Sequence, residues 1–215
     1  MYGHPKTLLS HDETIHALTK FKRLAILITA GASGLRATHL PLMYVPPADP
    51  RDPRDLGRLV GHLARANDHW RDAEDAPIEA LVLLPGPETY ISPSLYETKK
   101  QHGRAVPTWN YETIHAHGPL RVYHDEGSLR AVVAALSDRH EAERSTPWRI
   151  DEAPADYIER LIGGIVGIEI RLNRAAAKRK LSQDRADIDR TAVLEGLEAS
   201  GDACDREIAA AMRDV

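Results

Sequence analysis

A short segment of the chain gathers aromatic rings and imidazoles, side chains that could bind a metal ion or a flat cofactor. This segment, AVPTWNYETIHAHG at residues 105–118, holds Trp109, Asn110, Tyr111, His115 and His117. On a strand its two histidines point to the same face and could share a metal ion. His39 and His62, on other expected strands, could complete the metal site. No H-E-x-x-H or paired-cysteine motif accompanies them, and eleven histidines make a chance pairing ordinary. We therefore assign no metal site.

Alternation along this expected strand sorts its side chains into two faces. One face carries Trp109, Tyr111, His115 and His117, and the other carries Thr108, Asn110, Ile114 and Ala116. Packing in a barrel or in a subunit interface would explain the rings. The same segment could instead line the wall of a cofactor cleft.

A ligand that carries phosphate accounts for more of the polar residues. GHLARAND ends an expected strand with Arg65 and Asn67 at a helix start, where free N–H groups and a cation favour an anion. YETKK adds Tyr96 and Lys99, three apart on one helix face. A flat heteroaromatic ligand needs flat side chains and backbone donors, which PTWNY and ATHLP can supply. Taken alone, Arg65 is better explained as a surface residue that begins a helix.

Other chemistries have little support in the sequence. GASGL is only loosely similar to a nucleophile elbow, because Gly34 stands one place too early, and a hairpin turn explains it better. Cys204 lies in a polar helical tail with no histidine nearby in sequence. No Walker motif occurs, and GGIVG lacks the G-x-G-x-x-G spacing, so a doubly wound nucleotide-binding fold is disfavoured.

The composition is that of an ordinary globular protein. Of 215 residues, 42% are hydrophobic and 28% charged, with a net charge of −4, so one large core is feasible. The longest apolar run, LAILITAGA, is about half the ~18 residues of a membrane helix. The start, MYGHPKTLLSHDE, lacks a signal-peptide pattern. A single cysteine excludes an internal disulfide, and we expect a cytoplasmic protein.

One local run is strongly basic. RLNRAAAKRKLSQDRADIDR, residues 171–190, has seven Lys/Arg against three Asp. It could contact a phosphate, on DNA or on a small ligand. Charge alone favours a solvated basic helix or tail. Because the chain is negative overall and shows no helix-turn-helix with a basic recognition helix, direct DNA binding is weakly supported.

Hydrophobic periodicity and turn signals predict the elements that position these residues. Strands are expected at 23–30, 35–44, 58–64 and 78–86, a long strand or bent strand pair at 105–125, and a final strand at 165–175. Helices are expected at 12–21, 65–73, 92–103, 126–143 and 153–164 and in the tail from 187, with a GASG hairpin at 31–34 and a loop at 45–55. Strands joined by hairpins rather than by regular helix crossovers predict an antiparallel barrel or α+β fold.

Six motifs in order resemble one known family. They are ATHLPL (37–42), GHLARAN (61–67), YISPSLY (90–96), VPTWNY (106–111), IVGIEI (165–170) and KLSQDR (180–185), after a start, MYGHP, of the same kind. Together they resemble the PaiB-type FMN-binding negative transcriptional regulators over nearly the whole chain. GHLARAN with VPTWNY is the most specific pair.

The resemblance implies a mainly β, α+β fold: a six-stranded antiparallel split barrel with flanking helices and a helical C-terminal tail. It implies a homodimer with FMN at the subunit interface. We expect a barrel domain at 1–174, followed by a basic segment and helix at 175–215 that pack on the barrel or on the partner subunit.

The resemblance also implies cofactor-binding positions. Thr38, His39 and Leu40 would run beside the isoalloxazine, and His62, Ala64, Arg65 and Asn67 would hold the ribityl phosphate. Thr108, Trp109 and Asn110 would line the same cleft from either subunit. Lys180, Ser182, Gln183 and Arg185 would form a lid or a second phosphate contact.

Three positions depart from the family pattern. Ala177 stands where the family has Gly before its basic run, Asp184 replaces Asn, and Leu95 replaces Trp. A carboxylate near a phosphate is repulsive, so Asp184 either faces elsewhere or weakens binding there. The loss of Trp removes one flat surface.

Three functions are consistent with the sequence and with the resemblance. The first is an FMN-binding, PaiB-like protein that acts as a negative transcriptional regulator. The second is an FMN-dependent oxidoreductase that uses NAD(P)H, with His39 or His117 as candidate proton donor. The third is a split-barrel module for haem or another small ligand.

Overall fold

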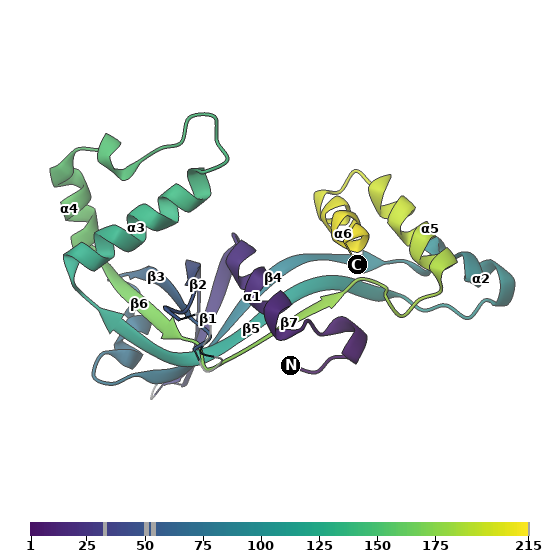
Figure 1. The fold of residues 1–215 in the computed structure, drawn as a ribbon, viewed down its shortest axis with the longest axis horizontal. Helices are drawn as coiled ribbons and strands as arrows, with labels where there is room; N and C mark the ends of the chain where they lie inside the picture. Colours follow the sequence, from purple (N-terminus) through teal and green to yellow (C-terminus); the bar gives the residue numbers. More distant parts are fainter. Residues whose placement is uncertain (32–33, 50–51, 53–54, 215) are drawn as a thin grey trace. The chain divides into compact units, whose positions relative to one another are not determined.

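The computed structural model describes residues 1–31, 34–49, 52 and 55–214 (Figure 1). Its strands are β1 (Leu24–Gly31), β2 (Gly34–Val45), β3 (Arg58–Ala64), β4 (Ile78–Ile91), β5 (Thr108–Tyr123), β6 (Ile165–Arg171) and β7 (Arg174–Lys180). Its α-helices are α1 (His11–Lys20), α2 (Glu97–His102), α3 (Glu126–Glu141), α4 (Ala155–Gly163), α5 (Asp187–Glu198) and α6 (Ala203–Arg213). Its short 3-10 helices are η1 (Pro5–Thr7), η2 (Asp68–Ala73), η3 (Pro93–Leu95) and η4 (Ile150–Glu152).

The strands form one sheet whose order is β4-β1-β2-β3-β6-β5-β7. Because β4 also pairs with β5, the first six strands of this order close on themselves, and β7 extends the sheet beyond β5. The expected six-stranded antiparallel barrel with flanking helices is confirmed. Gly31 pairs with Gly34 at the end of the β1–β2 hairpin, while the two central residues of the expected GASG turn lie outside the described residues.

The chain divides into two compact units. The barrel unit comprises residues 15–84 and 115–175, and the tail unit comprises residues 1–14, 85–114 and 176–215. Strands β4 and β5 contribute residues to both units. The expected domains at 1–174 and 175–215 stay a prediction.

In β1 the barrel unit buries alternate residues, among them Ala25 and Leu27, as a half-buried strand requires. β3 instead buries three consecutive residues, from Leu59 to Gly61, and also Leu63. Helix α3 packs on β2, β3 and β6. A small second core, Leu129, Ile158 and Ile162, joins α3 to α4.

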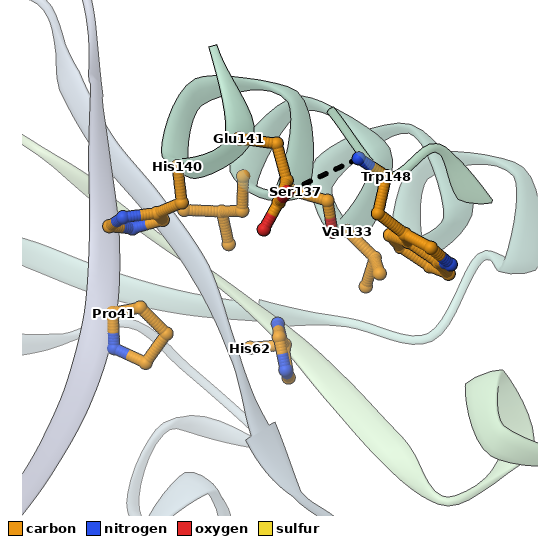
Figure 2. A pocket seen from close by; sticks show the side chains of 8 residues that line it. Pro41, His62, Val133, Ser137, His140, Glu141 and Trp148 are labelled. Carbon is orange, nitrogen blue, oxygen red and sulfur yellow. Dashed lines mark hydrogen bonds between the residues drawn. The ribbon is translucent and has the colours of Figure 1, made fainter. Parts of the chain in front are cut away.

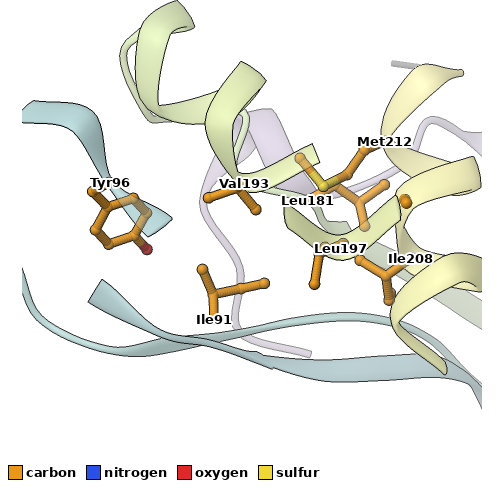
Figure 3. Packing of buried hydrophobic residues seen from close by; sticks show 8 residues of the cluster. Ile91, Tyr96, Leu181, Val193, Leu197, Ile208 and Met212 are labelled. Atoms are coloured by element: carbon orange, nitrogen blue, oxygen red, sulfur yellow. The ribbon is translucent and has the colours of Figure 1, made fainter. Parts of the chain in front are cut away.

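The tail unit has its own hydrophobic core (Figure 3). Helices α5 and α6 pack against each other, and the buried cluster consists of Ile91, Tyr96, Leu181, Val193, Leu197, Ile208, Ala209 and Met212. The single helical tail expected from residue 187 is therefore a pair of helices. Each presents one apolar stripe to this core.

The basic run at 171–190 is not a solvated helix or tail, as its charge favoured. The final strand expected at 165–175 ends at Arg171, and a separate strand, β7, follows it within the basic run. Ala177 of β7 is buried, and its carbonyl accepts the N–H of Leu9 at 3.0 Å. Pairing with β5 and a bridge between Leu8 and Lys178 hold the run extended. Tertiary pairing thus overrides local charge and helix propensity here.

Most other expected elements are confirmed, with shifts at their ends. Strand β3 occupies the expected residues, and β4 runs five residues beyond the expected end at 86. The helix expected at 92–103 is two pieces, η3 and α2, because Tyr96 between them has an extended backbone. In the loop expected at 45–55, Val45 belongs to β2, and residues 50, 51, 53 and 54 lie outside the described residues. Among the described helices, none is both long and apolar enough to cross a membrane.

Candidate functional site

A buried polar network joins β1, β2 and η2 in the barrel unit. At its centre His69 is only 2% exposed, and its ring nitrogens lie 2.8 Å from the hydroxyls of Thr29 and Thr38. Asn67 caps η2, since its side chain accepts the N–H of His69 at 3.1 Å. Its amide nitrogen donates to the hydroxyl of Thr38 at 3.2 Å. The structure therefore brings two expected cofactor residues, Thr38 and Asn67, into direct contact.

Arg65 stands at the end of β3 as an anchored cation. Its guanidinium donates to the carbonyls of Gly163 and Ile165, each at 3.0 Å, and a third nitrogen lies 3.5 Å from the His124 ring. These acceptors fix the side chain at the end of α4, and in the described part of the chain no carboxylate pairs with it. An exposed guanidinium held in this way keeps N–H donors and its charge for an anion.

His62 lines a pocket between α3 and the strands beneath it (Figure 2). The pocket has a volume of about 290 Å³ and is lined by Pro41, His62, Val133, Leu136, Ser137, His140, Glu141 and Trp148. The carboxylate of Glu141 accepts the N–H of Trp148 at 3.2 Å and so ties the segment after α3 to the helix. Ligand pockets of about 300–1,000 Å³ are typical, so this one suits part of a cofactor.

One atom of His62 has no partner in the described part of the chain. Its Nδ1 is buried and makes no hydrogen bond, and burial lowers the pKa of the ring, which keeps it neutral. A buried polar atom without a partner costs about 1–3 kcal/mol, so such an atom at a pocket indicates a missing hydrogen-bonding group.

The remaining positions expected in the barrel unit differ in access. His39 is exposed on β2, and Ala64 is exposed at the end of β3. Leu40 is 3% exposed and belongs to the core, so only its backbone is available to a ligand.

In the tail unit, Lys180 of β7 fastens the start of β5. Its ammonium donates to the hydroxyl of Thr108 and, at 2.9 Å, to the carbonyl of Trp109. The Trp109 ring is 52% exposed and meets the Tyr90 ring edge-on, with centroids 5.9 Å apart. Three expected residues thus lie together and leave a large ring in solvent.

Three other expected residues of the tail unit already have internal partners. Asn110 and Ser182 are buried and bond to each other. The Gln183 side chain accepts the N–H of Leu181 and donates to the carbonyl of Arg179, each at 2.7 Å. The hydrogen bonds of these side chains stabilise the turn between β7 and α5.

Tyr96 and Lys99 are not brought together on one helix face. Tyr96 precedes α2 and is 2% exposed in the core, while Lys99 is exposed. The Arg185 guanidinium lies 4.9 Å from the centroid of the Tyr96 ring, a cation–π contact. The N-terminus of α2 already has an anion, because Asp189 accepts the N–H and hydroxyl of Thr98 at 2.8 and 2.7 Å.

Two family departures have local explanations. Leu95 packs against α5 where a Cβ on Gly196 would lie 2.6 Å from its side chain. Asp184 is exposed, so its carboxylate is open to solvent.

The expected alternation along β5 is confirmed in burial. Asn110, Ile114 and Ala116 are buried, whereas His115 and His117 are partly exposed. Burial lowers the pKa of both rings, and an Arg174 nitrogen lies 3.1 Å from Nδ1 of His117. Within the described ranges, no three His, Cys, Asp or Glu side chains gather in a way that could hold a metal ion.

Sequence reasoning missed His69, Thr29 and Asp72. Thr29 and His69 are 40 residues apart and meet only through the pairing of β1 with β2 and the return of η2. The one local signal is the Asn67 cap, which places His69 in the first turn of η2.

Comparison with known proteins agrees with this architecture. Residues 1–174 match the model of the family described as "Putative FMN-binding domain". An uncharacterized protein of Aspergillus fumigatus is 35% identical over 89% of this chain and 90% of its own length. Protease synthase and sporulation protein PAI 2 of Bacillus subtilis is 32% identical over 83% of this chain and 80% of its own length.

Among solved structures, the FAD and haem binding protein of Mycobacterium smegmatis shares the fold. Its TM-score is 0.57 at 15% identity, over 86% of this chain and 80% of that one. The family match confirms the resemblance found in the sequence and FMN as the cofactor it implied. The chain belongs to this FMN-binding domain family.

Proposed function

We propose that the barrel unit holds FMN along β2 and β3, with Arg65 at the phosphate and Thr38, Asn67 and His62 at polar groups of the cofactor. The observation that carries this placement is the buried, unpartnered Nδ1 of His62 at the pocket under α3. Because burial keeps this ring neutral, Nδ1 would form one hydrogen bond with the ligand, as acceptor or as donor according to the tautomer of the ring. Arg65 adds an anchored cation for the phosphate.

When bound, FMN supplies redox chemistry, and the chain's residues bind, orient and shield it. The pocket offers the apolar side chains of Val133, Leu136 and Trp148 beside the polar atom of His62. This combination of apolar surface with few polar groups is typical of cofactor sites.

The test of this placement is the affinity of the flavin-free protein for FMN, followed by quenching of flavin fluorescence. His62→Phe should weaken binding about tenfold or more, the equivalent of ~1.4 kcal/mol. His16→Phe is the matched control, since His16 is exposed on α1 and does not line the pocket. Equal affinities for the His62 variant and the control would contradict the placement.

A homodimer with FMN at the subunit interface forms part of the proposal. The tail unit supports it, because Trp109 and Tyr90 are 52% and 49% exposed and stack edge-on. Exposed aromatic pairs of this kind are typical of interfaces. Sedimentation of the protein with FMN should give a dimer, and Trp109→Ser should shift it toward monomer. A monomeric wild-type protein would exclude this arrangement.

The proposal also includes a role in transcriptional regulation. It is supported by likeness to a relative named for protease synthesis and sporulation. Cations of the basic run have internal partners: Arg179 pairs with Glu112 at 2.5 Å, Lys180 bonds Thr108 and Trp109, and Lys178 donates to the carbonyl of Tyr2 at 3.4 Å. Lys178 lies over the Tyr111 ring, 5.2 Å from its centroid. If regulation acts through DNA contact by this run, Lys178 is a suitable residue to test, because its hydrogen bond to Tyr2 lies at an exposed position.

Retention of DNA from the region of the protein's own gene tests this role. Lys178→Gln should reduce retention at moderate salt, whereas Lys100→Gln, which removes an exposed cation of α2, should not. Equal retention for both variants would remove the basic run as a DNA contact. A regulatory role would then require another surface or a protein partner.

A flavin-dependent oxidoreductase is the second candidate, and His39 is the observation that favours it. Its imidazole is exposed on β2, and within the described residues no hydrogen bond to its side chain is formed, whereas an Arg174 nitrogen contacts His117. An exposed imidazole can donate a proton to a flavin substrate or accept one from it. Bleaching of bound FMN by NADH or NADPH without oxygen, slowed in His39→Gln, would support this activity, and unreduced flavin would oppose it. The same spectra would show a Soret band if the protein held haem.

A further inference from the structure

The directions of the hydrogen bonds around His69 can be deduced one by one. Thr29 donates its hydroxyl proton to the carboxylate of Asp72 at 3.1 Å. A hydroxyl has one proton, and an ionised carboxylate can only accept. The Thr29 oxygen must therefore accept from Nε2 of His69, 2.8 Å away, so this nitrogen carries a proton.

The other ring nitrogen must then be an acceptor. His69 is 2% exposed, and burial lowers its pKa, which favours the neutral ring. A neutral imidazole with its proton on Nε2 has a lone pair on Nδ1. Thr38, whose oxygen is 2.8 Å from Nδ1, therefore donates its only hydroxyl proton to His69.

Asn67 completes the set. Its side-chain oxygen accepts the backbone N–H of His69 at 3.1 Å, which turns its amide nitrogen toward Thr38 at 3.2 Å. The Thr38 oxygen thus gives its proton to His69 and accepts one from Asn67. One lone pair of Thr38 is left, and it can only accept.

Two carboxylates and one guanidinium surround the network. Burial has the largest effect on the pKa of His69 and lowers it, Arg36 lowers it further, and Asp72 and Asp68 raise it. Arg36 of β2 lies 3.5 Å from the carboxylate of Asp72 and 2.9 Å from that of Asp68. These two acids of η2 and the cation of β2 are the charged groups that act on the ring.

We propose that His69 fixes Thr38 as an acceptor that selects the N–H of the flavin ring system over ligand groups that only accept, such as carbonyls. The ligand rests on the proposed function, whereas the polarity of Thr38 rests on the network alone. His69 is a positioning residue here, because it acts on the ligand through Thr38. A flavin in its oxidised form has one ring N–H, at N3, and we assign this group to the free lone pair of Thr38.

The directions of the hydrogen bonds around His69 can be measured without flavin. In the ¹⁵N-labelled, flavin-free protein, correlation of ring protons with ring nitrogens at pH 7.5 reports which nitrogen of each histidine is protonated, and His69→Gln identifies the His69 signals. We expect a neutral ring with its proton on Nε2. A proton on Nδ1, or on both nitrogens, would overturn the deduction.

The ligand preference is measured by comparing FMN with its N3-methyl analogue, in which the ring N–H is lost. Wild type should prefer FMN about tenfold or more, the value of one good hydrogen bond at ~1.4 kcal/mol. Thr38→Ser keeps the hydroxyl and should keep the preference. Thr38→Val, which removes the hydroxyl at similar volume, should abolish it, and His69→Phe should reduce it by freeing the Thr38 proton.

These outcomes distinguish the hydrogen-bond direction at Thr38 from the assignment of the flavin N3 to Thr38. A steric effect of the methyl group would persist in Thr38→Val, and an unchanged preference there would overturn the assignment of N3 to Thr38. If wild type bound neither flavin, the proposed function would fail together with this assignment. The nitrogen signals of His69 would still decide whether Thr38 is an acceptor.

Discussion

Asn110 and Ser182 hold each other through two hydrogen bonds inside the tail unit. The amide nitrogen of Asn110 donates to the Ser182 hydroxyl at 3.0 Å, and that hydroxyl donates back to the Asn110 oxygen at 3.2 Å. Both residues are buried, and Ser182 adopts the left-handed backbone conformation, with φ at 62°. The pair thus fixes the turn that leads from β7 into α5.

The turn makes a specific prediction about the two smallest replacements of Ser182. Both lose the hydroxyl and leave Asn110 short of a partner, at a cost of about 1–3 kcal/mol. Ser182→Gly also relieves the left-handed backbone by about 1 kcal/mol, whereas Ser182→Ala does not. Urea unfolding should therefore rank the glycine variant above the alanine variant in stability, and the opposite order would contradict the strained turn.

Asp189 should stabilise the tail unit through α2. Its carboxylate accepts two hydrogen bonds from Thr98, which lowers the pKa of Asp189 against the opposing effect of its burial. Asp189→Ala should reduce the free energy of unfolding by about 1–2 kcal/mol, the range for a lost cap. Asp187→Ala removes the same charge from an exposed position of the same helix and should change it little. Similar losses for both would indicate a general charge effect.

Arg65 should distinguish FMN from riboflavin, which lacks the phosphate. Arg65→Met should weaken FMN about tenfold or more while changing riboflavin affinity less, because an anchored guanidinium contributes mainly at a phosphate. Arg65→Lys should restore only part of the affinity, since a lysine cannot reproduce the bonds to Gly163 and Ile165. If both flavins lost affinity equally, Arg65 would act on the fold alone.

The buried histidines should make the protein less stable in weak acid. Burial lowers the pKa values of His62 and His69 below the ordinary 6.5. As pH falls below about 6.5, the unfolded chain binds protons that the folded chain refuses, so the free energy of unfolding decreases. The decrease continues down to the lowered pKa values of the folded state.

Urea unfolding between pH 7.5 and 5 measures this loss. His62→Asn should flatten the dependence on pH in the flavin-free protein, while His16→Asn, at an exposed position, should leave it unchanged. Parallel curves for wild type and the His62 variant would contradict a neutral, buried His62.

The sequence predicted the barrel well because its strands carry their own signals. β3 is a short, mostly apolar run between a loop rich in Pro and Asp and an Asn cap, so its bounds were predicted to the residue. β7 was missed because RAAAKRK combines helix-forming alanines with charge, and only pairing with β5 makes it a strand.

The candidate site was harder to predict, because its geometry depends on contacts between distant segments. Motifs identified Thr38, Arg65 and Asn67, yet His69, which connects two of them, has no motif of its own. Asn110 and Ser182 were selected by the same motifs, but their side chains are buried against each other. Such motifs mark positions that the family needs without separating contacts to a cofactor from contacts that build the fold.

Titration of the flavin-free protein with FMN tests the central claim most directly. The account predicts saturable quenching of flavin fluorescence with one FMN per chain, weakened about tenfold or more by His62→Phe and by Arg65→Met. Absence of saturable binding by the wild-type protein, or binding that neither substitution weakens, would contradict it.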